Sequence, residues 1–168
     1  MNAALRLGLV LLVGLAIPDL SAAEAPKPAV EIIDFGLYAA TPTRRVPDPN
    51  VPGGEQGRAT GIRLLEQTET VPGKIGQFFG FRFRVNDPAL NGKDLRLAIR
   101  HPPMTDPSGR TATEGARRLV VRTGEREEVH LFGFDHRWEI AAGDWTFQVV
   151  YEGKVLVEKR LRVVAASD

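Results

Sequence analysis

The sequence contains no cysteine. This absence excludes disulfides, thiolate metal sites, iron–sulfur clusters and a cysteine nucleophile, and it excludes a lipid anchor on a cysteine. Neither sign of charge is in excess, because 22 Lys and Arg residues stand against 21 Asp and Glu residues, for a net charge of +1. A nucleic-acid-binding domain usually carries a strong basic surplus, so we expect no nucleic-acid partner.

The first 23 residues have the three parts of a secretory signal peptide. Arg6 supplies a positive n-region, residues 7–17 form an apolar run, and Ser21-Ala22-Ala23 offers the small residues that signal peptidase reads. The run is too short to cross a bilayer, which needs about 20 apolar residues. We predict cleavage near Ala23, a mature chain of residues 24–168 in the periplasm or outside the cell, and no transmembrane segment. An uncleaved anchor is the alternative interpretation.

Apolar and polar residues alternate with a period of two through most of residues 24–168, whereas helical periodicity is scarce. Phe79, Phe81 and Phe83 share one face of a strand, and Trp145 begins another such pattern after a glycine turn. We expect Trp145 to point into the core. About eight short strands separated by turn signals predict an all-β fold, a single immunoglobulin-like antiparallel β-sandwich of about 7–8 strands with its core at about 29–164.

Turn signals predict how these strands connect. Residues 41–57 contain four prolines, which favours a long surface loop because proline lacks an amide donor. Residues 101–110 are predicted as a second loop for the same reason. Asn91-Gly92 predicts a hairpin between strands at 77–85 and 95–99, and Thr123-Gly124 predicts a strand pair between 119–122 and 128–132.

Three segments carry a resemblance to a known family. They are residues 71–80, with Pro72-Gly73 and Phe79-Gly80; residues 101–109, a proline-rich turn; and residues 133–154, which include Gly143-Asp144-Trp145. Over roughly 30–164 the chain resembles exported bacterial proteins known only as a domain of unknown function with a loosely immunoglobulin-like sandwich. The loop at 44–57 departs from that pattern. The resemblance implies the compartment and the fold, and it implies no activity.

One candidate binding site is the loop at Phe134–Ile140, where five adjacent residues combine charge, an imidazole and an indole: Asp135, His136, Arg137, Trp138 and Glu139. Arginine and tryptophan often anchor interfaces, and sandwich loops often carry recognition. The alternative is structural, with Trp138 plugging the end of the core while Asp135 and Glu139 tie the loop to nearby amides.

A second candidate site is a set of four arginines, Arg82, Arg84, Arg96 and Arg100, each opposite the apolar face of its strand. If the Asn91-Gly92 hairpin forms, all four share one outer surface. Facing like charges destabilise strand pairs. We therefore expect either neutralising carboxylates, from Glu66, Glu69 or Glu114, or an anionic partner.

Catalytic and metal signatures are weak. The three histidines, His101, His130 and His136, are scattered, and Ser108 lies in a turn rather than in a Gly-x-Ser-x-Gly motif. We predict no catalytic residue, no metal site and no cofactor.

The function itself stays open. The leading hypothesis is a non-catalytic binding module that contacts another envelope protein or an anionic polymer. One alternative is a hydrolase with an unrecognised site near 134–140, and another is a structural or stress-protective subunit that uses an open sheet edge.

Overall fold

The computed structural model describes residues 27–48, 54–124 and 126–165. The predicted signal peptide at 1–23 lies outside these ranges. Within them no helix has the length and apolar character needed to cross a membrane. The elements are β1 (Val30–Pro47), β2 (Glu55–Glu66), β3 (Thr70–Gly73), β4 (Phe78–Val85), the 3-10 helix η2 (Pro88–Leu90), β5 (Asp94–Thr105), β6 (Thr111–Val120), β7 (Glu127–Gly133), the 3-10 helix η3 (Arg137–Glu139), β8 (Gly143–Tyr151) and β9 (Lys154–Ala165).

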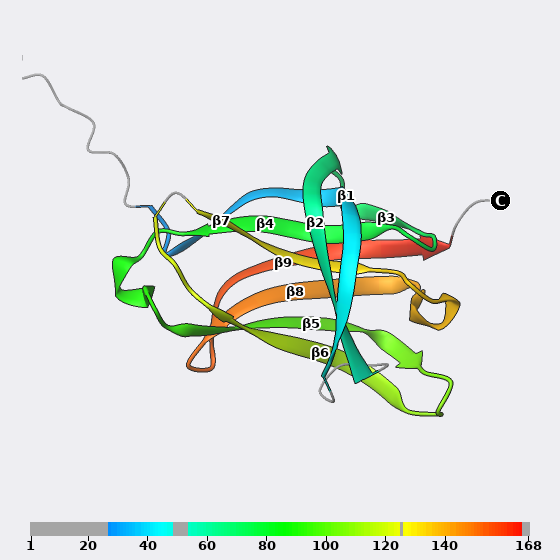
Figure 1. Cartoon of the computed structure of the whole chain (residues 1–168). Helices are drawn as coiled ribbons and strands as arrows, with labels where there is room; N and C mark the ends of the chain where they lie inside the picture. The colour runs from blue at the N-terminus through cyan, green and yellow to red at the C-terminus, as the bar shows by residue number, and fades with distance from the viewer. Residues whose placement is uncertain (1–26, 49–53, 125, 166–168) are drawn as a thin grey trace, which may run out of the picture.

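The strands form two sheets that pack as a sandwich (Figure 1). Sheet A has the order β2-β1-β4-β7, and sheet B has the order β3-β9-β8-β5-β6. Neighbours are antiparallel except β3 and β9, which pair in parallel. The all-β sandwich prediction is confirmed, with nine described strands rather than 7–8.

The core lies between the sheets and is rich in aromatic rings. Phe79, Phe81 and Phe83 of β4 are fully buried. Phe79 and Phe81 contact the rings of Trp145 and Phe147 of β8, and Phe83 packs against Phe81. Trp145 points inward as predicted, and its indole nitrogen donates to the Ala141 carbonyl at 2.9 Å. Burial of each such ring contributes about 1.5–3 kcal/mol, so the period-two pattern accounts for the main source of stability.

Both predicted hairpins are wrong, because their strands belong to different sheets. β4 lies in sheet A and β5 in sheet B, and the next crossing takes the chain from β6 back to β7. Asp87 caps η2 by accepting from the Ala89 amide, which makes the first connection a helical turn with Leu90 buried beneath it. The two crossings also bond to each other, since Val121 exchanges backbone hydrogen bonds with Gly92 and Lys93.

Both predicted loops are largely strand. β5 continues to Thr105 and pairs with the start of β6, so only a tight turn remains, which the Asp106 carboxylate closes by accepting from Ser108 and Arg110. In the range 41–57, β1 runs on to Pro47 and β2 begins at Glu55; residues 49–53 lie outside the described part.

The extended parts of β1 and β2 form an arm, defined here as residues 39–47 and 55–63. β1 pairs with β4 only as far as Tyr38, and beyond it with β2 alone. Each arm strand thus has a free side, where a proline costs no ladder bond. Register shifts after Ala39 and Pro42 bend the arm away from the direction of sheet A. The arm crosses the other strands steeply toward β6 (Figure 1).

Candidate functional site

A cleft of about 1210 Å³ lies beneath the arm. It opens between β7, the last strand of sheet A, and β6, the last strand of sheet B. Leu97 and Ile99 of β5, Leu119 of β6 and Phe132 of β7 give it an apolar lining. Among the described residues no strand follows β7 at the edge of sheet A, so β7, β6 and the arm bound the cleft there.

Arg117 is the central charged residue of this cleft. It pairs in register with the buried Leu97, so its side chain points inward from an edge strand. Its guanidinium donates to the Val129 carbonyl of β7 at 2.6 Å. Burial lowers the pKa of Arg117; the carboxylate of Glu128 opposes this shift, whereas the nearby charge of Arg58 adds to it.

Three arginines of the lining, Arg58, Arg117 and Arg137, form no ion pair with any carboxylate in the described ranges. The acids of the lining are engaged elsewhere. Glu55 and Asp135 pair with Arg45, Asp106 with Arg110, and Glu128 with Arg126. Guanidinium groups from the arm, β6 and η3 thus line one space and form no ion pair among the described residues, although the charge of Glu128 acts on Arg117 at longer range.

The predicted loop at Phe134–Ile140 forms one end of the cleft. The Glu139 carboxylate accepts from the amides of Asp135 and His136 at 2.6 and 2.7 Å, which closes the turn. Burial raises the pKa of Glu139, although these two amides oppose the shift. Trp138 packs half-buried against the core and stacks on His136, with ring centroids 5.8 Å apart.

Asp135 has a different role from the one that the structural interpretation gave it. Its carboxylate binds the Arg45 guanidinium at 2.8 Å and so ties the arm to the turn. Arg137 stays exposed beside it. Glu139 ties the turn to backbone amides, as the structural interpretation expected, and all five residues, Asp135, His136, Arg137, Trp138 and Glu139, lie in the lining of the cleft. A binding role for this loop stays a prediction.

These groups do not converge as a catalytic set. The Asp135 carboxylate faces Arg45, the Glu139 carboxylate faces backbone amides, and the His136 ring lies on Trp138. In the described part of the chain, no cluster of three potential metal-ligating residues occurs.

His130 lies on the core side of the cleft. Its Nε2 atom is 2.9 Å from the Ala98 carbonyl, and its Nδ1 atom is buried without a hydrogen-bond partner. Burial lowers the pKa of His130 to about 3, so the ring is neutral at physiological pH.

The other candidate arginines do not share one surface. Arg82 and Arg84 lie on the outer face of sheet A, whereas Arg96 and Arg100 lie on that of sheet B, because β4 and β5 are in different sheets. Glu114 pairs with both Arg96 and Arg100, as expected for one of the three proposed acids.

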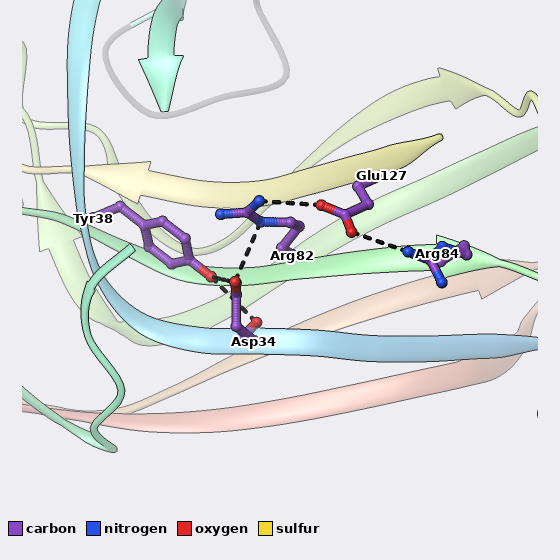
Figure 2. Close-up of polar contacts among 5 residues, drawn as sticks. All are labelled: Asp34, Tyr38, Arg82, Arg84 and Glu127. Atoms are coloured by element: carbon purple, nitrogen blue, oxygen red, sulfur yellow. Dashed lines mark hydrogen bonds and ion pairs between the residues drawn. The ribbon is translucent and has the colours of Figure 1, made fainter. Parts of the chain in front are cut away.

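Arg82 and Arg84 belong to a compact network (Figure 2). Glu127 binds Arg82 at 3.1 Å and Arg84 at 3.0 Å, and Asp34 lies 3.4 Å from Arg82. Burial opposes the charged form of Arg82, but Glu127 and Asp34 outweigh it and raise its pKa. The Tyr38 hydroxyl donates to Asp34 at 2.5 Å, and burial raises the pKa of Tyr38 well above its usual value. Asp34 and Glu127, rather than Glu66 or Glu69, neutralise this pair.

Sequence reasoning missed Arg58 and Arg117. Arg58 lies in the segment predicted as a loop. Arg117 left a readable signal, because it occupies an inward position between Gly115 and Leu119 in an alternating strand.

The family model described as a domain of unknown function (DUF3859) matches residues 26–163. An immunoglobulin-like protein from Pseudomonas aeruginosa has a similar structure, with a TM-score of 0.60 and 22% sequence identity over 80% of this chain and 96% of that chain. This likeness concerns the fold alone, and no curated protein matches the sequence. The match to the family model confirms the resemblance seen in the sequence, and the chain belongs to the DUF3859 family.

Proposed function

We propose that this protein is an exported, non-catalytic binding module whose site is the cleft between β6 and β7. The ligand is anionic and has an apolar part. The observation that carries this proposal is the set of three guanidinium groups, of Arg58, Arg117 and Arg137, that line one cleft without carboxylate partners.

The energetics support a ligand at this place. Arg117 is half-buried, and burial opposes its charged form, a cost that the carboxylate of Glu128 offsets only in part. The charge of Arg58 adds repulsion, as its effect on the pKa of Arg117 shows. An anion between the two removes that repulsion, while the apolar floor contributes burial of apolar surface.

The arm adds selectivity. It covers the cleft and is tied at Asp135 by one exposed ion pair, and such pairs contribute little stability. A ligand can therefore displace this contact at a cost of about 0–1 kcal/mol.

The test is isothermal titration of the purified protein with poly-glutamate and with dextran sulfate, at low and at moderate salt. We expect at least one polyanion to bind, more weakly as salt rises. The variant Arg58→Gln/Arg117→Met/Arg137→Gln is expected to lose about tenfold or more in affinity, which is about 1.4 kcal/mol.

The matched control is Arg96→Gln/Arg100→Gln, which removes two exposed arginines that already pair with Glu114. This variant should bind like the unaltered protein. Equal losses in both variants would show nonspecific attraction to net charge and would contradict the proposal, as would no binding of either polyanion.

Export is a separate part of the proposal, and it rests on the leader at residues 1–23. Fractionation of the native host with intact-mass measurement tests it. The expected species begins at Glu24 and lies outside the cytoplasm; a full-length cytoplasmic species would overturn this part.

A further inference from the structure

Beyond the anionic character of the ligand, we infer that the cleft takes an extended acidic peptide segment that adds as a strand to the free edge of β7. This inference rests on the proposed function and names its ligand class. A strand at that position would complete sheet A opposite β5 and β6.

The free edge of β7 is aimed into the cleft. The Phe134 amide donates to the Gln77 carbonyl. This bond shows which residues of β7 direct their backbone N–H and C=O groups toward β4. In an antiparallel ladder, residues alternate between bonding one neighbour and the other. The N–H and C=O groups of Val129, Leu131 and Gly133 therefore point away from β4.

The hydrogen bond from Arg117 is independent evidence that the backbone groups of Val129 point away from β4. Its guanidinium reaches the Val129 carbonyl from β6, on the side opposite β4. One group of the edge is thus already used by a side chain from across the cleft. A peptide backbone can take this place and offer matching donors and acceptors along the edge.

Side chains of an added strand would meet suitable surroundings. On the inner face of β6, Gly115 carries no side chain, Arg117 carries a positive charge and Leu119 is apolar. Arg58 of the arm and Arg137 of η3 stand at other parts of the lining. Alternate side chains of a strand point to opposite sides, so acidic residues at every second position would reach these guanidinium groups.

An anionic polysaccharide satisfies the charges but not the strand edge. It has no regular series of amide donors and acceptors at the spacing of β7. The backbone groups of the edge therefore favour a peptide, and a polysaccharide becomes an outcome that the experiment distinguishes.

The experiment begins with affinity selection of a pooled library of blocked ten-residue peptides, random at every position, on the immobilised purified protein. We expect the retained peptides to be enriched in Asp and Glu at alternate positions. The most enriched peptide is then added to ¹⁵N-labelled protein, and amide hydrogen exchange is measured by NMR.

Strand addition predicts slower exchange, by about tenfold or more, at alternate residues of β7. Leu131 and Gly133 should gain protection, while His130 and Phe132, whose amides already face β4, should change little. Arg117→Met should weaken peptide binding about tenfold, whereas Arg96→Gln should not.

Three results would overturn the inference. One is a library without acidic enrichment, and another is peptide binding without protection at Leu131 and Gly133. The third is cleft-dependent binding of dextran sulfate alone, which would leave the proposed function standing. Failure of every polyanion and peptide would overturn both.

Discussion

The outer face of sheet A and the cleft beneath the arm use arginine in opposite ways. On the outer face, Glu127 bridges Arg82 and Arg84, and Asp34 adds a second carboxylate. In the cleft, Arg58, Arg117 and Arg137 have no such partners within the described ranges. A balanced network contributes to the fold, whereas an unbalanced set leaves binding energy for a ligand.

The largest expected effect is the pH dependence of the free energy of unfolding that arises from His130, on the core side of the cleft. The pKa of His130 is about 3 in the folded protein and about 6.5 in the unfolded chain. Between these values only the unfolded chain binds the proton, so the free energy of unfolding falls as pH drops from 6.5 toward 3. Above 6.5 this contribution is fully present. The slope reaches about 1.4 kcal/mol per pH unit.

Urea unfolding across that pH range measures this slope, and His130→Phe is the matched variant. Phenylalanine fits the aromatic surroundings of Phe81 and Phe147, although the Ala98 carbonyl loses its partner at a cost of about 1–3 kcal/mol. The variant should therefore be less stable at neutral pH but show a flatter pH dependence. An unchanged slope would mean that His130 does not titrate on unfolding.

The next effect compares one arginine from each region after the same substitution. Arg82→Met removes one partner each from Asp34 and Glu127, which are only partly exposed. Tyr38 still donates to Asp34 and Arg84 still pairs with Glu127, so the variant should lower the free energy of unfolding by about 1 kcal/mol. Arg117→Met removes a half-buried charge that forms no ion pair in the described ranges, and its hydrogen bond to the Val129 carbonyl, which lies on the open edge of β7. It should leave stability within about 0.5 kcal/mol of the original or raise it.

Chemical denaturation of the two variants at neutral pH gives both values. Equal destabilisation would break the comparison, because it would mean that Arg117 contributes to the fold as Arg82 does.

The smallest expected effect concerns the arm. Arg45→Ala removes the ion pair with Asp135, an exposed contact that should change global stability by less than about 0.5 kcal/mol. Amide exchange along 41–46 should nevertheless become faster. Arg44→Ala, one residue away in the same strand, is the control and should leave arm exchange unchanged; an equal effect of both would show that the pair does not tie the arm.

The sequence predicts single strands well and their partners poorly. Phe79, Phe81 and Phe83 alternate whichever sheet they enter, and Trp145 follows its glycine turn into the core. The alternation says nothing about the neighbour, so Asn91-Gly92 looked like a hairpin. Asp87-Pro88, a capping residue before proline, is the sequence feature that indicates η2 and thus a connection from one sheet to the other.

The candidate site was only partly predictable for the same reason. Residues 135–139 are adjacent in sequence, and their mixture of charge and aromatic groups marked them directly. Arg58 and Arg117 come from distant strands and meet Arg137 only through the sandwich and the arm. The prolines at 42 and 47 concealed the arm, because a two-stranded ribbon tolerates proline on its free sides.

The most direct test of the central claim is NMR of arginine side chains during titration with poly-glutamate. The account predicts that the Nε signals of Arg58, Arg117 and Arg137 shift and saturate together, while those of Arg82 and Arg84 stay in place. Shifts at Arg82 and Arg84 with an unchanged cleft would contradict it.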